Sequence, residues 1–85
     1  MTWLCAELRD ETTLEMLTRQ LREDTAAARA SGRVLADAQV YIAPYRKWHR
    51  VFFNPSALAM LPVLEQLAHA PCDPPEEHER RLAMA

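Results

Sequence analysis

The sequence predicts a small α+β domain in which a three-stranded, mainly antiparallel sheet packs against helices. Three observations favour this class: apolar residues alternate with period two in separate short stretches, a capped amphipathic helix lies between two of these stretches, and a proline-initiated apolar segment follows them. A chain of 85 residues fits one domain, so we interpret 1–85 as a single unit. The predicted element order is β-α-β-β-α-α.

The first predicted elements are a strand at 2–8 and a helix at 12–31. In the strand, Leu4 and Leu8 belong to the apolar set, although their spacing of four also fits a helical turn. In the helix, Thr12 and Glu15 have the spacing of a capping box. One apolar stripe follows at intervals of three, four and seven, made of Leu14, Leu17, Leu21 and Ala28. The single glycine, Gly32, lies where a left-handed residue commonly ends a helix.

Two further strands are predicted at 33–43 and 48–53. Both alternate, and the segment Pro44-Tyr45-Arg46-Lys47 between them has turn composition, with proline fixing φ at the first corner. We therefore predict an antiparallel hairpin.

The C-terminal part is predicted to be helical. Asn54 followed by Pro55 is a helix-start signal, because asparagine caps well and proline loses nothing at the first helical position. This helix is predicted to run to about Ala70, with Pro62 kinking or splitting it after one and a half turns. A short, loosely docked helix is predicted at about 74–83, within the segment 71–85.

The predicted hairpin carries the strongest functional signal. Five of the six aromatic residues lie between Tyr41 and Phe53, and no acidic residue occurs between Asp37 and Glu65, although the net charge is −2. Rings and cations concentrated on an acidic protein indicate a binding surface, because Trp, Tyr and Arg dominate binding hot spots. The candidate partner-binding residues are Tyr45, Arg46, Lys47, Trp48, His49 and Arg50.

We predict that this hairpin binds another protein with an acidic surface, so that the chain acts as an adaptor or inhibitor without catalysis. Small acidic α+β chains without cofactors are common among inhibitors carried by phages and mobile elements, including anti-CRISPR proteins, although no motif identifies such a family. A nucleic-acid-binding module using the same hairpin is an alternative. A small ribonuclease or toxin-like enzyme, with His49 as base beside Arg46, Arg50 and Tyr45, is a second alternative.

A second candidate surface lies in the apolar segment after Asn54, where no side of the predicted helix is polar. Such a helix either is buried on two sides or faces another chain. The candidate dimer face comprises Met60, Leu64 and Leu67, so a homodimer is one reading and a central core helix is the other.

The sequence favours neither a cofactor nor a metal. His69, Cys72 and His78 could supply ligands, but structural zinc sites usually show a second closely spaced pair. Cys5 reads as a small core residue and Cys72 as a free thiol beside a turn. No stretch approaches the ~18 apolar residues of a membrane span, so we expect no membrane association. The N-terminal stretch has no cationic region, so we expect a cytoplasmic location.

Overall fold

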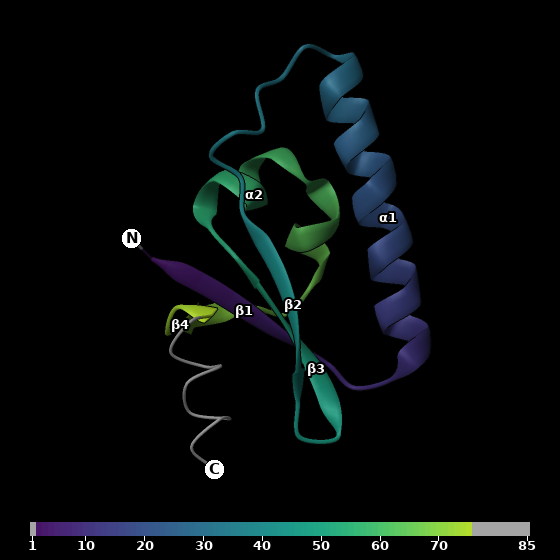
Figure 1. Cartoon of the computed structure of the whole chain (residues 1–85), viewed down its shortest axis with the longest axis vertical. Helices are drawn as coiled ribbons and strands as arrows, with labels where there is room; N and C mark the ends of the chain where they lie inside the picture. Colours follow the sequence, from purple (N-terminus) through teal and green to yellow (C-terminus); the bar gives the residue numbers. More distant parts are fainter. Residues whose placement is uncertain (1, 76–85) are drawn as a thin grey trace.

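The computed structural model describes residues 2–75, which form an α+β fold with helices on one face of an antiparallel sheet (Figure 1). The elements in chain order are β1 (Trp3–Leu8), α1 (Glu11–Ala30), β2 (Val40–Tyr45), β3 (Trp48–Phe53), α2 (Pro55–Met60), the 3-10 helix η1 (Pro62–Gln66) and β4 (Ala70–Cys72). The predicted fold class is therefore confirmed. The helix predicted at 74–83 lies almost entirely outside the described residues.

The sheet has four strands in the order β2-β3-β1-β4, where three were predicted, and each neighbouring pair is antiparallel. The extra strand is β4, in a segment that we expected to be the end of the second helix and its stop. The backbone at Leu67 is already extended, with φ −87° and ψ 140°. Pro71 then occupies an edge strand, where the missing N–H of proline is tolerated.

The N-cap of helix α1 lies two residues earlier than predicted, at Asp10 rather than Thr12. Asp10 is the N-cap, with extended backbone, and its carboxylate accepts a hydrogen bond of 2.6 Å from the Thr13 N–H. Hydrogen bonding to Thr13 also holds the pKa of Asp10 below its usual value. Thr12 is consequently a helical residue rather than the cap, because the stronger aspartate cap stands just upstream.

The end of α1 is as predicted. Gly32 has φ +76°, and its N–H donates to the carbonyl of Arg29 while the N–H of Arg33 donates to that of Ala28. These two bonds form a Schellman motif, in which a residue with left-handed backbone turns the chain so that N–H groups after the helix donate to its last carbonyl groups.

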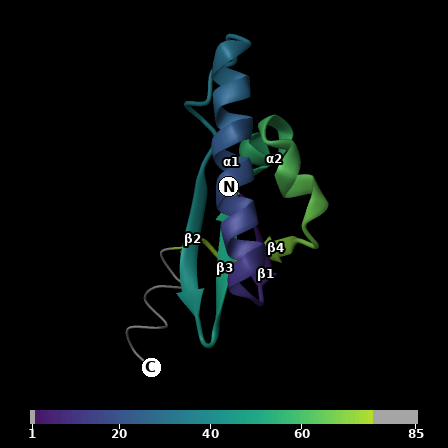
Figure 2. The ribbon, with the colours of Figure 1, turned by 90° about the vertical axis from the view of Figure 1, so that its right-hand side faces the viewer.

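The core lies between one face of the sheet and the helices (Figure 2). Ala6 and Leu8 of β1 and Val51 and Phe53 of β3 point to the same face, because alternate residues of a strand share a side. The helical segments contribute the rest of the buried cluster, namely Leu17, Ala57, Leu61 and Leu64. The opposite face carries Cys5, Glu7, Arg50, Phe52 and Cys72, and none of the described helices packs on it.

Proline splits the second helix, as predicted, but the helix is shorter than expected. Helix α2 ends at Met60, Leu61 is extended, and η1 begins at Pro62. The carboxylate of Asp24 in α1 accepts a hydrogen bond of 3.0 Å from the Val63 N–H. This side chain satisfies a donor that the start of η1 leaves free, and it fastens α1 to η1.

Asn54 is the one buried polar residue in the described chain, and it organises the entry into α2. As predicted, its side chain caps the helix, accepting from the Ala57 N–H at 2.9 Å. The same oxygen accepts from the Gln39 N–H at 3.0 Å, and the amide nitrogen donates to the Asp37 carbonyl at 2.6 Å. These bonds hold residues 37–39 as a loop, so β2 starts at Val40 rather than near residue 33.

The part of the chain that the structure describes contains no helix long and apolar enough to cross a membrane.

Candidate functional site: the hairpin surface

The hairpin of β2 and β3 projects past the rest of the described chain, and its turn forms one end of that part of the chain (Figure 1). The turn is tighter than predicted. Tyr45 pairs with Trp48, which leaves only Arg46 and Lys47 in the turn and places Pro44 within β2. Pro44 is tolerated there because β2 is an edge strand. Arg46, Lys47 and Trp48 are exposed, so the charged end of the hairpin faces solvent.

Two guanidinium groups lie over one tyrosine ring beside this turn. The Cζ atom of Arg50 is 3.9 Å from the centroid of the Tyr45 ring, and that of Arg46 is 5.4 Å from it. Each contact is a cation–π interaction, worth about 0.5–1 kcal/mol at an exposed site. The ring therefore holds both arginines near one another on the sheet face that the described helices leave uncovered.

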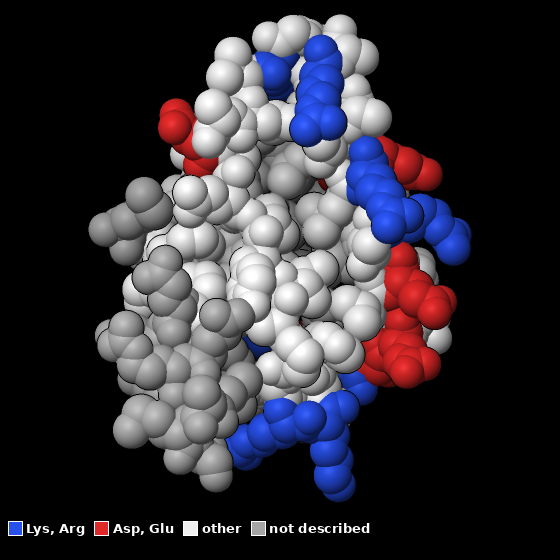
Figure 3. Space-filling view, in the orientation of Figure 1, with Lys and Arg blue, Asp and Glu red and all other residues white. Residues whose placement is uncertain are grey.

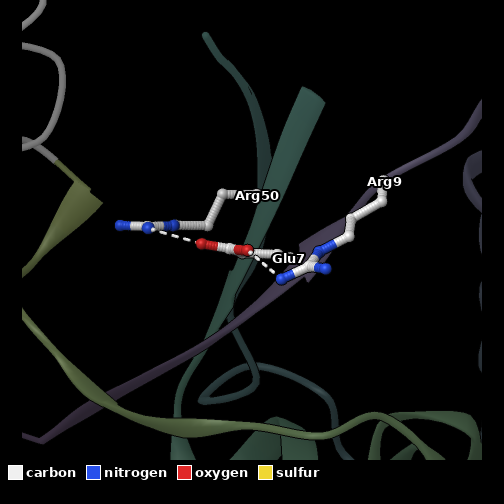
Figure 4. A network of polar contacts seen from close by, with 3 residues as sticks. All are labelled: Glu7, Arg9 and Arg50. Carbon is white, nitrogen blue, oxygen red and sulfur yellow. Dashed lines mark hydrogen bonds and ion pairs between the residues drawn. The ribbon is translucent and has the colours of Figure 1, made fainter. Parts of the chain in front are cut away.

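The strand pairing adds two residues that sequence reasoning missed, Glu7 and Arg9. The Glu7 carboxylate accepts a hydrogen bond of 3.2 Å from Arg50 Nη2 and pairs with Arg9 Nη2 at 3.5 Å, so it bridges the two arginines (Figure 4). The Cζ atom of Arg9 in turn lies 4.9 Å from the centre of the Trp48 ring system. We define the hairpin surface as Tyr45, Arg46, Lys47, Trp48, Arg50 and Arg9.

Arg50 is the most constrained cation of the hairpin surface. Its side chain is 22% exposed and lies between the Tyr45 ring and the Glu7 carboxylate. Its Nε is buried and has no hydrogen-bond partner within the described chain. A guanidinium that is already fixed loses less side-chain entropy on binding, so Arg50 is preorganised for a partner acceptor.

Arg46 adopts a left-handed backbone conformation, with φ +56°. Arg46 is the first of the two turn residues, and glycine is the residue that adopts positive φ there without steric cost. For a long side chain this conformation costs about 1–2 kcal/mol. Strained residues of this kind cluster at functional sites, and the observation favours a role for the Arg46 side chain outside the fold.

Replacing Arg46 with glycine separates stability from binding. We expect Arg46→Gly to raise the free energy of unfolding by about 0.5–1 kcal/mol, because glycine adopts positive φ without steric cost while the lost cation–π contact is weak. Urea denaturation followed by circular dichroism measures the change. A clear loss of stability would show instead that the Arg46 side chain supports the turn.

His49 does not join the other predicted contact residues. It pairs with Leu8 and Pro44, and strand alternation puts it at the margin of the core face, while Arg50 and Tyr45 lie on the opposite face. The predicted group of His49, Tyr45, Arg46 and Arg50 therefore does not converge on one surface. His49, although predicted as a contact residue, is therefore not part of the hairpin surface.

The predicted dimer face is also corrected. Leu64 is 0% exposed and lies in the core, so it has no surface to offer a second chain. Met60 and Leu67 are half-buried and pack against the same core cluster. One side of the apolar segment is core, since Ala57, Leu61 and Leu64 are buried, whereas Pro55, Ala59 and Pro62 on the other side are exposed. A homodimer through the remaining exposed side stays a prediction.

Charge is unevenly distributed on the view of Figure 3. Basic side chains lie over the turn of the hairpin at the lower end and also over the upper part of α1, whereas the acidic ones seen among described residues lie mainly along α1 and away from the turn. The turn thus presents a local positive surface on a chain of net charge −2.

Metal ligands do not gather within residues 2–75: no group of three or more His, Cys, Asp or Glu side chains there is arranged to hold an ion. His69 Nδ1 lies 2.8 Å from the Leu67 carbonyl, and its ring meets the Phe53 ring edge-on at 5.5 Å. His78 lies outside the described residues.

No protein-family model, no curated protein and no solved structure matches this chain. The fold and the hairpin surface are therefore the basis for a functional proposal.

Proposed function

We propose that this chain is a non-enzymatic protein-binding module that uses the hairpin surface to contact an acidic patch on another protein. It would act as an adaptor or inhibitor in the cytoplasm, in the manner of the small anti-defence proteins of phages and mobile elements. The observation that carries the proposal is the ordered set of rings and guanidinium groups at the exposed end of the hairpin.

The arrangement suits a protein partner for two reasons. Trp48 is 37% exposed and sits beside the cations, so a partner can bury an aromatic anchor and pair its acids in the same contact. The guanidinium of Arg50 is held in place by Tyr45 and Glu7, which reduces the entropy lost on association. At short range, the local positive charge of the turn would orient an acidic patch of the partner toward the hairpin.

Single-stranded nucleic acid is the second candidate. Trp48 and Tyr45 lie beside arginines at the exposed end of the hairpin, and arginines beside rings are the combination that binds stacked bases and phosphates. The net charge of −2 weighs against this candidate, because nucleic-acid affinity usually depends on a broad basic surface.

Affinity capture from host lysate, with and without nuclease, tests the proposal. The test variant is Arg46→Glu/Lys47→Glu, which reverses two exposed charges at the turn and leaves Arg50 in its pair with Glu7. We expect the wild-type chain to retain a specific protein after nuclease treatment and the variant to lose it.

A matched control carries the same charge change elsewhere. Arg22 on α1 and Arg33 after it are exposed, and the C-terminal end of α1 lies at the opposite end of the described chain from the turn of the hairpin (Figure 1), so Arg22→Glu/Arg33→Glu should still capture the partner. If nuclease treatment abolishes capture, single-stranded nucleic acid replaces a protein as the favoured partner. Equal loss in both variants would mean that overall charge, and not the hairpin surface, controls binding.

A further inference from the structure

The two cysteines of the chain are brought together by the sheet, which the sequence did not indicate. The register of β1 with β4 pairs Trp3 with Cys72 and Cys5 with Ala70, so Cys5 and Cys72 are diagonal neighbours on adjacent strands. Both point to the sheet face that the described helices leave uncovered, and both are half-buried free thiols. Cys5 was predicted to be a small core residue, but it is half-buried and lies outside the core cluster.

Strand β4 is weakly attached by its backbone. It has only three residues, so it can make few backbone hydrogen bonds to β1. Its attachment therefore depends on side-chain contacts more than that of β3, which pairs with β1 over five residues. A covalent link between β4 and β1 would change the stability of this edge of the sheet.

We propose that Cys5 and Cys72 form a redox-sensitive clasp, in which a disulfide joins β4 to β1. The oxidant is a small-molecule disulfide such as oxidised glutathione. One protein thiolate attacks it, forming a mixed disulfide and releasing a glutathione thiol; the second protein thiolate then attacks the mixed disulfide and releases another. Two protein S–H bonds are lost, one protein S–S bond forms, and one glutathione disulfide becomes two thiols.

Closure requires a small movement of β4. Diagonal neighbours in an antiparallel pair have Cα atoms about 7–8 Å apart, whereas bridged cysteines have theirs at about 4.4–6.8 Å. A short edge strand can make this shift more easily than a central one. Ala70 of β4, with Ala68 and His69 before it, lines a hollow that also borders Glu7, Arg9 and Arg50. Forming the disulfide would therefore move one wall of this hollow, next to Arg9 and Arg50 of the hairpin surface. An effect of the disulfide on partner binding rests on the proposed function.

The thiol chemistry sets the conditions. Burial, followed by the hydrogen bond and charge of Cys5, raises the pKa of the Cys72 thiol to about 12; Asp73 also raises it, and Arg50 opposes the shift. Since only the thiolate reacts, exchange at Cys72 is slow at neutral pH and faster in alkaline solution.

Intact mass spectrometry and thermal unfolding of the full chain test the clasp without knowledge of any partner. After incubation with oxidised glutathione at alkaline pH, we expect a monomer lighter by ~2 Da, with a Tm higher by about 10 °C that dithiothreitol reverses. Cys5→Ser and Cys72→Ser should each take up a single glutathione and show no such rise. Wild-type chain that carries two glutathiones, that cross-links between molecules, or that forms the bond without a rise in Tm would overturn the proposal.

Discussion

Leu64→Glu is expected to unfold the protein. Leu64 is 0% exposed and is surrounded by Leu17, Phe53, Ala57 and the rest of the buried cluster. An unpaired charge in such a site costs several kcal/mol, and the total stability of a chain of 85 residues is about 4–13 kcal/mol. Loss of the cooperative urea or thermal transition, followed by circular dichroism, is the measurement.

Met60→Glu is the matched control for this substitution. Met60 is half-buried at the end of α2, where a carboxylate can reach water. We therefore expect Met60→Glu to remain folded, with a free energy of unfolding lower by about 1–2 kcal/mol. A Leu64→Glu chain that stays folded and changes only its oligomeric state would contradict the core placement of Leu64.

Asn54→Ala is expected to lower the free energy of unfolding by about 3 kcal/mol or more, the second largest effect after Leu64→Glu. The change leaves the N–H groups of Ala57 and Gln39 and the carbonyl of Asp37 without their side-chain partner at a buried or half-buried site. Each unsatisfied buried group costs about 1–3 kcal/mol, partly relieved where water can enter. Urea denaturation gives the free energy of unfolding.

Asn54→Asp separates the two functions of this side chain. The aspartate keeps an acceptor for the N–H groups of Ala57 and Gln39 but cannot donate to the Asp37 carbonyl. We therefore expect Asn54→Asp to lower the free energy of unfolding measurably, but by less than Asn54→Ala does. If both variants are as stable as wild type, the Asn54 bonds do not hold the 37–39 loop.

The local elements were predictable from the sequence because their signals are local. Gly32 ended α1, Asn54 with Pro55 started α2, and Pro62 split the apolar helix, each through the backbone chemistry of that one residue type. The strand at 48–53 was also predictable, because its rings and alternation occupy one short stretch.

Long-range relations were not predictable in the same way. The pairing of β4 with β1 joins residues far apart in the chain, and a three-residue strand with a central proline gives almost no propensity signal. The same holds for Glu7 and Arg9, which reach the hairpin only through the register of β1 with β3. The hairpin surface was thus partly predictable. The residues at and beside the turn were named from the sequence, His49 lies on the other face of the sheet, and Glu7 and Arg9 were not predicted.

The affinity of the captured partner for three forms of the chain tests the central claim most directly. Titration calorimetry would compare the wild type, Arg46→Glu/Lys47→Glu and the control Arg22→Glu/Arg33→Glu, after thermal unfolding has shown that all three are folded. We predict that the hairpin variant loses at least about 30-fold in affinity, a loss of about 2 kcal/mol, and that the control binds within a few-fold of wild type. Equal affinities for the wild type and the hairpin variant would contradict the assignment of the hairpin as the binding surface.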